Sequence, residues 1–288
     1  PCHTDIYLVD GGYSPDRGKM ILDILDSSFS EINGKKTYTL QAVICTHTHA
    51  DHVSGCAYLE AKTGCQIWCT RGERGNFELP LYEQEIFSGG FPLPECQSPF
   101  YQAQPVYDAK LIQADETLSL SDGTKLTYID LPGHHLDMIG VKAETASGTT
   151  VLFSADAIFG RQRMKKYWIP FLLDVGSFKT SLRKIVSLNA DFVLPSHGDL
   201  VPNKKIESLA ELNRYAVITT EKSIVSILEK PHTQEELIKG IADQDHIPLG
   251  LAQYYLIGCT IRSYISYLYR SGKIRFYIKD NLMLWQSV

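Results

Sequence analysis

Four side chains of the kind that bind metal ions fall within six consecutive residues of this 288-residue chain. They are His47, His49, Asp51 and His52, and they directly follow the apolar run at residues 42–45. His47 and His49 are two positions apart, so both imidazoles leave the same face of an extended segment and can reach one metal ion. Asp51 and His52 come where the chain has to turn into a helix, so we expect their side chains to reach a second metal position next to the first. Because the chain has only nine histidines, three within six residues indicate a site for two metal ions rather than a solvated turn.

Three later apolar runs also end in a residue that can bind a metal ion. The runs and their residues are 126–131 with His134 (after Pro132-Gly133), 151–154 with Asp156, and 192–194 with His197. Each of these three residues alone is equally well explained as a turn or capping residue. Side chains that follow strand ends converge on one rim of a sheet, however, so together with the first segment they indicate a single site.

The pattern of apolar runs predicts an α/β fold. With 44% apolar and 21% charged residues, the chain has the composition of a globular protein with a sizeable core. Short apolar runs bounded by Gly, Asp and Pro alternate with stretches of helical periodicity up to about residue 200. Helical spacing predicts helices around residues 20–25 and 178–188. The expected strands are residues 6–9, 42–46, 66–69, 125–130, 139–143, 150–154 and 192–195.

Residues 71–109 interrupt this pattern. They are rich in Gly, Pro, Tyr and Phe, and the Pro and Gly residues break every long element. A stretch of this length inside a compact domain is usually functional or disordered, and its aromatic residues favour packing against another part of the protein. We therefore expect an insertion that helps to cover the active site.

The chain changes character after about residue 204. Residues 205–229 and 249–270 have helical patterns, and Thr233 with Glu236 predicts a capping box that opens a short helix between them. Residues 273–278 and 282–285 predict two strands around a turn. This order is typical of a winged helix-turn-helix unit. We expect a catalytic domain at residues 1–204 and a helical, winged-helix-like domain at residues 205–288.

These motifs resemble the metallo-β-lactamase superfamily, in particular its hydroxyacylglutathione hydrolase or lactamase-beta-2-like branch. Hydrolases of the superfamily have an HxHxDH segment, a His after Pro-Gly, an Asp and a final His in a small-residue turn. This chain has all of these pieces in that order over about residues 5–200. The resemblance implies an αββα sandwich followed by a small C-terminal winged-helix-like domain. It also implies two metal ions, the first held by His47, His49 and His134, the second by Asp51, His52 and His197, with Asp156 bridging both.

The ligand set implied by the resemblance favours zinc. Imidazoles and carboxylates without a thiolate suit Zn²⁺, and iron or manganese remain compatible. The complete HxHxDH string differs from the flavin-linked diiron branch, which has Glu in place of the second His. Asp51 and His197 stand where a β-lactam-hydrolysing enzyme would need Cys and other residues, so that activity is disfavoured. Asp10 matches an acidic residue that orients a ligand histidine in the family, and a plain turn before Gly11-Gly12 explains it equally well.

We expect a hydrolase of a small ester, thioester or lactone. Two divalent ions about 3.5–4 Å apart lower the pKa of a bridging water toward about 7, so a metal-bridging hydroxide is the expected nucleophile. Asp51, besides binding metal, is expected to accept the proton of this hydroxide and pass it to the leaving group. Tyr167 is a candidate donor to the oxyanion, as tyrosines are in lactone and thioester hydrolases of the family. The basic stretch at residues 161–166 is either a site for an anionic group of the substrate or a solvated loop.

Two other functions stay open. The same two-metal core supports phosphodiester or RNA hydrolysis, for which the C-terminal unit would hold nucleic acid through Arg262, Arg270, Lys273 and Arg275. A metal-bearing regulator without enzymatic activity is disfavoured because no ligand is missing. The net charge of −5, with nine Lys or Arg against eight Asp or Glu in residues 210–288, disfavours nucleic acid and membranes as partners. Tyrosines of the C-terminal unit fit a packing or homodimerisation module that closes over the active site, and a small molecule is the expected substrate.

Cysteine usage predicts a cytoplasmic location. The seven cysteines are odd in number, scattered and mostly embedded in apolar runs, as expected of reduced thiols in a core. No apolar run approaches the roughly 18 residues that cross a bilayer, and no targeting pattern is found at the N-terminus. Because the chain begins at Pro1 rather than at Met, a trimmed N-terminus stays open.

Overall fold

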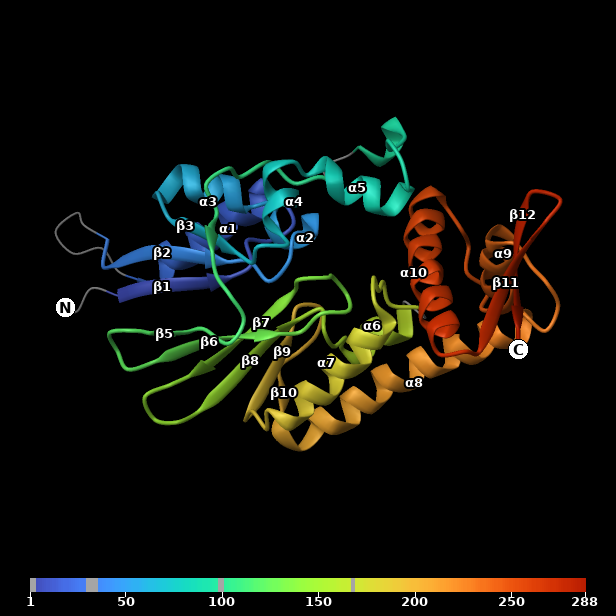
Figure 1. The fold of residues 1–288 in the computed structure, drawn as a ribbon. Helices are drawn as coiled ribbons and strands as arrows, with labels where there is room; N and C mark the ends of the chain where they lie inside the picture. The colour runs from blue at the N-terminus through green and yellow to red at the C-terminus, as the bar shows by residue number, and fades with distance from the viewer. Residues whose placement is uncertain (1–3, 30–35, 98–100, 167–168) are drawn as a thin grey trace. The chain divides into compact units, whose positions relative to one another are not determined.

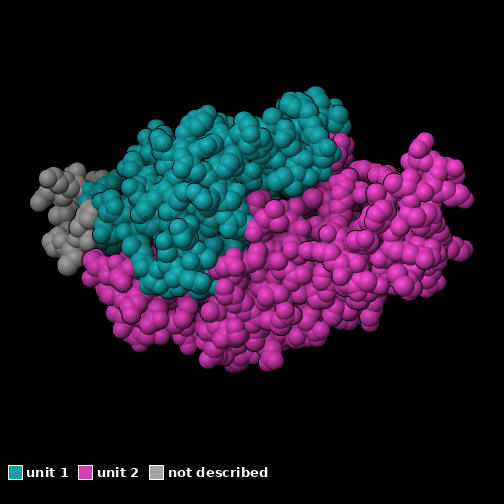
Figure 2. All heavy atoms as spheres, in the orientation of Figure 1, with its two compact units in different colours: residues 1–118, 127–129, 137–141 teal, residues 119–126, 130–136, 142–288 magenta. Residues whose placement is uncertain are grey.

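The computed structural model describes residues 4–29, 36–97, 101–166 and 169–288. The chain divides into two compact units, each drawn from more than one stretch of sequence (Figure 2). Unit 1 comprises residues 1–118, 127–129 and 137–141, and unit 2 comprises residues 119–126, 130–136 and 142–288. Within the described residues, no helix is both long and apolar enough to cross a membrane.

Unit 1 contains a parallel sheet with the strand order β1-β2-β3-β4 (Figure 1). Parallel neighbours need a crossover connection, and helices lie in each of these connections. The strands are β1 (Thr4–Val9), β2 (Tyr38–Ile44), β3 (Gln66–Cys69) and β4 (Lys110–Leu111). The helices are α1 (Pro15–Ser28), α2 (Ala50–Val53), α3 (Cys56–Thr63), α4 (Arg74–Glu78), α5 (Leu81–Ser88) and the 3-10 helix η1 (Pro94–Cys96).

The core of unit 1 surrounds β2. Leu40 and Val43 of this strand are buried together with Leu59 of α3 and Ile67 of β3. A strand buried on both faces appears in the sequence as a continuous apolar run, which is why residues 42–45 were recognisable. The prediction that this strand extends to residue 46 is wrong. β2 ends at Ile44, because the Thr46 N–H donates to a side-chain oxygen of Asp10, at 2.8 Å, rather than to a neighbouring strand.

The insertion at residues 71–109 is more regular than its sequence pattern indicates. It contains α4, α5 and η1, none of which the pattern predicts, and α5 stops at Gly89 with a left-handed φ of 70°. The helices are short, as the Pro and Gly residues require. They form because Phe77 and Val106 join the core around β2, and burial stabilises helices that would be marginal alone. Among the other aromatic residues, Phe87 is buried, whereas Phe91 is 75% exposed.

The second sheet has the strand order β10-β9-β8-β7-β6-β5. Within it, β8 and β9 pair in parallel and β9 pairs with β10 in antiparallel fashion. The strands are β5 (Thr117–Ser119), β6 (Lys125–Asp130), β7 (Ile139–Glu144), β8 (Thr150–Ala155), β9 (Phe192–Pro195) and β10 (Val201–Pro202). The predicted strands at residues 125–130 and 192–195, like the one at 66–69 in unit 1, have the predicted bounds. Between β8 and β9 lie α6 (Arg161–Lys166) and α7 (Val175–Ser187).

The C-terminal part of unit 2 contains three helices and a hairpin (Figure 1). They are α8 (Asn203–Ile227), α9 (Gln234–Gln244), α10 (Leu251–Arg270), β11 (Ile274–Lys279) and β12 (Leu282–Ser287). The predicted capping box is confirmed, since Thr233 N donates to Glu236 Oε2 at 2.8 Å and Glu236 N donates to Thr233 Oγ1 at 3.3 Å. Asp280 and Asn281 adopt φ angles of 51° and 62°, as the two-residue turn of a tight hairpin requires.

A buried carboxylate holds these C-terminal elements on α7. Glu221 of α8 is buried, and its Oε1 accepts a hydrogen bond from Lys179 Nζ of α7 at 2.8 Å. Lys179 Nζ also donates to the phenol oxygen of Tyr267 on α10, at 3.0 Å. On the other side, Lys273, just before β11, reaches Glu221 Oε2 at 3.3 Å. One carboxylate therefore ties together α7, α8, α10 and the hairpin.

Removing this carboxylate should destabilise unit 2. Glu221→Ala leaves the ammonium of Lys179 in a partly buried position without its counter-charge, and we expect a loss of about 3 kcal/mol in the free energy of unfolding. The control is Glu211→Ala on the same helix, which removes an exposed pair with Arg214 and should change the free energy of unfolding much less. Urea unfolding of the three proteins measures both values, and equal values for the two variants would contradict the role of Glu221.

The loss should also depend on pH. Burial lowers the pKa of Lys179, but its hydrogen bonds to Glu221 and Tyr267 raise it by more, so the pKa lies above its usual 10.5. A raised pKa of this kind contributes stability that is complete below the usual pKa and is lost as the pH rises through the raised value. The difference between wild type and Glu221→Ala should therefore stay constant from neutral pH to about pH 10 and shrink above it. A difference that grows at high pH would contradict this assignment.

Candidate metal centre

The metal-binding residues expected from the sequence follow strand ends in both units. His47 and His49 lie in the loop after β2, and Asp51 and His52 lie in α2. His134 follows β6, Asp156 directly follows β8, and His197 follows β9. Described residues that could hold a metal ion include His47, His49, Asp51, His52 and Glu83 of unit 1, and His134, His135, Asp156 and His197 of unit 2.

Asp10, at the end of β1, organises the histidine segment of unit 1. Its Oδ1 accepts from Thr46 N at 2.8 Å, and its Oδ2 accepts from Thr46 Oγ1 at 3.0 Å and from His52 Nδ1 at 2.8 Å. Because Thr46 Oγ1 gives its hydrogen to Asp10, it can only accept from His47 Nδ1, 3.0 Å away. Both rings therefore carry their hydrogen on Nδ1 and a lone pair on Nε2. A plain turn before Gly11-Gly12, the alternative explanation of Asp10, accounts for none of these contacts with Thr46 and His52.

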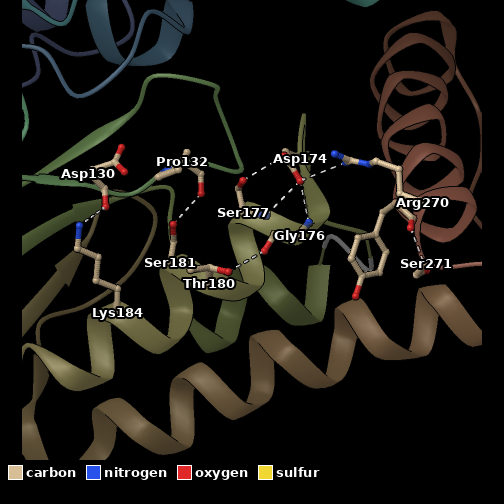
Figure 3. A pocket seen from close by; sticks show the side chains of 11 residues that line it. Asp130, Pro132, Asp174, Gly176, Ser177, Thr180, Ser181, Lys184, Arg270 and Ser271 are labelled. Carbon is tan, nitrogen blue, oxygen red and sulfur yellow. Dashed lines mark hydrogen bonds and ion pairs between the residues drawn. The ribbon is translucent and has the colours of Figure 1, made fainter.

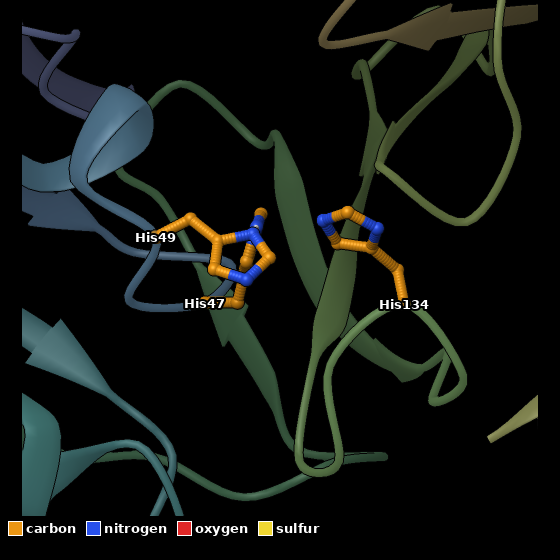
Figure 4. A group of neighbouring side chains, drawn as sticks. All are labelled: His47, His49 and His134. Atoms are coloured by element: carbon orange, nitrogen blue, oxygen red, sulfur yellow. Dashed lines mark hydrogen bonds between the residues drawn. The ribbon is translucent and has the colours of Figure 1, made fainter. Parts of the chain in front are cut away.

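The rings of His47 and His49 are turned toward each other (Figure 4). Nε2 of His47 lies 3.0 Å from Nδ1 of His49, and the ring of His52 packs against His47 with centroids 4.1 Å apart. On its other side His49 presents Nε2 to Glu83 Oε1, also at 3.0 Å. The negative charge of Glu83 beside Nε2 favours the tautomer of His49 with its hydrogen on Nε2. In that tautomer the lone pair of His49 Nδ1 faces the lone pair of His47 Nε2, an arrangement that favours a cation between them.

Two acidic residues of the insertion support this loop, and the sequence pattern did not single them out. Glu73 is fully buried, and its Oε2 accepts from the backbone N of Thr48 at 3.0 Å. Glu83 is 3% exposed and contacts His49. A sequence signal for Glu83 exists in retrospect, because Glu83 and Phe87 are four positions apart and share the buried face of α5.

In unit 2, Asp156 lies between two histidines. Its Oδ2 is 3.3 Å from Nε2 of His134 and 3.4 Å from Nε2 of His197. The side chain of Asp156 is only 3% exposed. A single carboxylate oxygen thus faces one nitrogen of each ring, as a bridging ligand would.

Helix α7 fixes the loop that carries His134 (Figure 3). Ser181 donates to the carbonyl oxygen of Pro132 at 2.7 Å, and the carbonyl of Gly133 accepts from Asp174 N at 2.9 Å. Gly133 has a φ of 132°, and a Cβ at this position would collide with the backbone of Phe178. The residues along this side of α7 line a surface pocket of about 570 Å³, which contains none of the predicted metal ligands. The pocket is therefore a feature of the surface beside α7 and is not the candidate metal centre.

The two histidines of unit 2 differ in their second nitrogen. Nδ1 of His134 donates to the carbonyl of Phe171 at 2.7 Å, which leaves the lone pair on Nε2 facing Asp156. Nδ1 of His197 instead meets the guanidinium of Arg163 at 3.2 Å, and a guanidinium only donates. The contact with Phe171 therefore leaves Nε2 of His134 available to a metal ion, whereas the ring of His197 is positioned by Arg163 of the basic stretch. Tyr167, the candidate oxyanion donor, lies outside the described residues.

The groups of described residues that could hold a metal ion contain no cysteine. Cys45 immediately precedes Thr46, but burial, together with the neighbouring thiol of Cys56, raises its pKa well above the usual 9.0. Burial likewise raises the pKa of Cys69 to about 12. The described cysteines are thiols rather than disulfides, and these two stay protonated at neutral pH. The donor set therefore consists of imidazoles and carboxylates.

The spacing of these donors fits a tetrahedral metal ion. Two ligands at 2.0–2.1 Å from zinc lie roughly 3.3 Å apart when the ion is tetrahedral. The donor separations within unit 1 (3.0 Å) and within unit 2 (3.3 and 3.4 Å) are close to this value. The donor separations in each unit therefore suit a divalent ion, and His197, whose Nδ1 accepts from Arg163, would bind through Nε2 after that nitrogen loses its hydrogen.

Comparisons with known proteins agree with this donor set. A family model described as the metallo-beta-lactamase superfamily matches residues 3–197. The chain is 22% identical over 230 residues to a beta-lactamase-like protein 2 homolog of Caenorhabditis elegans. The match covers 79% of this chain and 66% of that protein, so the chain spans just under two thirds of the relative's length.

Solved structures show a similar fold. A metallo-beta-lactamase family protein of Thermus thermophilus has a TM-score of 0.72 at 15% identity, covering 97% of this chain and 89% of that one. A beta-lactamase domain protein of Burkholderia ambifaria has a TM-score of 0.70 at 16% identity, covering 98% and 83%. The α/β metallo-β-lactamase fold expected from the sequence is confirmed by these matches.

Asp10→Asn should weaken metal binding while the fold is retained. Asn tolerates the positive φ of 63° at this position, but its amide has a single oxygen and cannot accept all three hydrogen bonds that Asp10 accepts from Thr46 N, Thr46 Oγ1 and His52 Nδ1. Loss of such a supporting carboxylate lowers metal affinity by about 10- to 100-fold. Zinc affinity is measured by competition with a chromophoric chelator. The control is Asp5→Asn on β1, whose exposed carboxylate binds Gln41. Equal affinities in the two variants would contradict the role of Asp10.

Proposed function

Because this chain belongs to the metallo-β-lactamase superfamily, we propose that it is a dinuclear zinc hydrolase of a small ester, thioester or lactone. Its membership and its candidate His and Asp ligands indicate a metal-dependent hydrolase. The number of metal ions, their identity and the class of substrate are parts of the proposal.

The observation that carries the proposal is the pair of facing nitrogens in His47 and His49. These nitrogens are 3.0 Å apart, and the contacts of His47 with Thr46 and of His49 with the charge of Glu83 favour the tautomers whose lone pairs face each other, an arrangement that a cation stabilises. Divalent metal ions are the cations that neutral imidazoles bind most strongly. The segment is therefore organised for a metal ion rather than for a hydrogen-bond network alone.

Asp156 supports a second metal ion. Its Oδ2 faces one nitrogen of His134 and one of His197, which the family resemblance assigns to different ions. We assign His47, His49 and His134 to the first ion, Asp51, His52 and His197 to the second, and Asp156 to both. A shared carboxylate offsets the mutual repulsion of two cations.

The residues around the ions have separate tasks. When bound, the two ions would lower the pKa of a water toward about 7 and polarise the carbonyl that it attacks. The carboxylate of Asp51 is 44% exposed, with Oδ1 3.8 Å from His52 Nε2, so it can reach a substrate as well as a metal. We assign to it the transfer of a proton to the leaving group. Asp10 keeps Nε2 of His52 available for the metal.

The substrate class is supported by the surroundings of His197. Arg163 places a guanidinium beside this ring, which suits a carboxylate or another anionic group on a small acyl substrate. Tyr167 would donate to the oxyanion. The relative from Caenorhabditis elegans supports the lactamase-beta-2-like branch, and the order α8, α9, α10, β11, β12 supports a winged-helix-like C-terminal domain. Buried thiols that form no disulfides support a cytoplasmic location.

Nucleic acid hydrolysis is the weaker alternative. The cations that it would use have partners within unit 2: Arg270 is 3.9 Å from Asp174, Lys273 reaches Glu221, and Arg275 donates to Gln286 at 3.0 Å. Phosphate binding would have to break these contacts, which lowers its net free energy.

Metal analysis and an activity panel test the proposal. Purified wild type loaded with zinc should hold two ions per chain and hydrolyse members of thioester, lactone or ester panels, and it should leave phosphodiesters intact. One ion per chain, bound without Asp51, His52 and His197 under metal-replete conditions, would contradict the dinuclear site. Salt-sensitive RNA cleavage that depends on Arg262 and Lys273 would favour the nuclease function.

Asp156→Ala should lose metal and activity together. Without the shared carboxylate, both ions lose a ligand and repel each other, so we expect kcat/KM to fall by more than about 100-fold. The fold should survive on its apolar core, which circular dichroism would verify. The control is Asp23→Ala, an exposed carboxylate of α1. Full turnover with two ions still bound to Asp156→Ala would show that this residue is not the bridge.

A further inference from the structure

We propose that Glu83 is a positioning residue for His49 and that the insertion at residues 71–109 thereby helps to build the metal centre. The inference rests on the proposed function, because it takes His49 as a metal ligand. It gives the insertion a role beyond covering a substrate.

The contact is direct. Glu83 Oε1 lies 3.0 Å from His49 Nε2, and on the opposite side of the same ring Nδ1 lies 3.0 Å from His47 Nε2. The negative charge of the carboxylate at this distance favours the tautomer with its hydrogen on Nε2, in which the lone pair of Nδ1 is available to a metal ion. Without Glu83, His49 could carry its hydrogen on either nitrogen, and only one of these forms binds a metal through Nδ1.

Asn76 of α4 holds Glu83 in place and connects it to the loop that carries the histidines. Its Oε2 accepts from Asn76 Nδ2 at 3.0 Å, and the same amide nitrogen donates to Thr48 Oγ1 at 3.1 Å. Thr48, between the two histidines, donates its backbone N–H to Glu73. Residues of the insertion therefore contact the histidine segment at two successive residues, Thr48 and His49.

The environment of Glu83 strengthens the effect. The side chain is 3% exposed, and Phe87, one turn further along α5, lies with its ring centroid 6.0 Å from that of His49. In such a site the negative charge is poorly screened by water, so it favours a cation bound at the far side of the imidazole. A buried carboxylate is costly for folding unless a positive charge compensates it, and a metal ion at Nδ1 would do so.

The test compares Glu83→Gln with Glu85→Gln. Both variants remove one negative charge from α5, but residues two apart on a helix lie on different faces. The amide introduced by Glu83→Gln carries no negative charge to favour a hydrogen on His49 Nε2, so zinc affinity, measured by chelator competition, should fall by about 10- to 100-fold. Glu85→Gln should bind zinc like wild type. Equal affinities for Glu83→Gln and wild type would overturn the proposal.

A second readout does not depend on metal. Two-bond ¹H–¹⁵N correlations of the histidine rings in metal-free protein should show His49 protonated on Nε2 in wild type and on a mixture of nitrogens in Glu83→Gln. The same tautomer in both proteins would overturn the inference. Should wild type bind no zinc, the proposed function fails, while the tautomer comparison still decides the role of Glu83.

Asn76→Ala provides a milder change in case Glu83→Gln does not fold. It removes the donor that holds Glu83 Oε2 but keeps the carboxylate, so the zinc affinity should fall by several-fold, less than in Glu83→Gln. An affinity equal to that of wild type in this variant would contradict the network that positions Glu83.

Discussion

Two oxygens of Asp10 receive three hydrogens from the segment that carries the histidines, and the order of that segment depends on this arrangement. The carboxylate accepts from the backbone and hydroxyl of Thr46 and from the ring of His52. Since Thr46 then accepts from His47, one side chain sets the hydrogen positions of two imidazoles. Thus the end of β1 determines which nitrogens of α2 and the preceding loop can bind a cation.

This arrangement prepares the site for a cation but lowers the stability of the metal-free protein. Lone pairs that face each other and carboxylates that are almost fully buried destabilise the metal-free fold. Functional sites commonly carry such local conflict, which the apolar core elsewhere has to offset. Unit 1 has that core around β2, where Val43 and Leu59 are fully buried. A metal ion bound here would remove the conflict and stabilise the folded state, by more the tighter it binds.

The sequence predicted features that depend on neighbouring residues and missed those that depend on tertiary contacts. Strand ends followed by His or Asp are local patterns, so the places of His134 and Asp156 could be predicted from apolar runs and the residues after them. The role of Glu83 depends on a contact between α5 and a loop far away in the sequence. Its Gly- and Pro-rich surroundings also conceal the helix. The boundary near residue 204 and the role of Tyr167 stay predictions.

Gly133 has a consequence for how such a chain can change over generations. Its φ of 132° and its proximity to the backbone of Phe178 leave no space for any other side chain, so almost every mutation there would displace either the loop of His134 or the start of α7. Exposed positions of α5 such as Tyr82 are under no such restriction. Laboratory evolution toward a new substrate would therefore accumulate changes in the insertion, while position 133 would remain nearly invariant in every selected lineage.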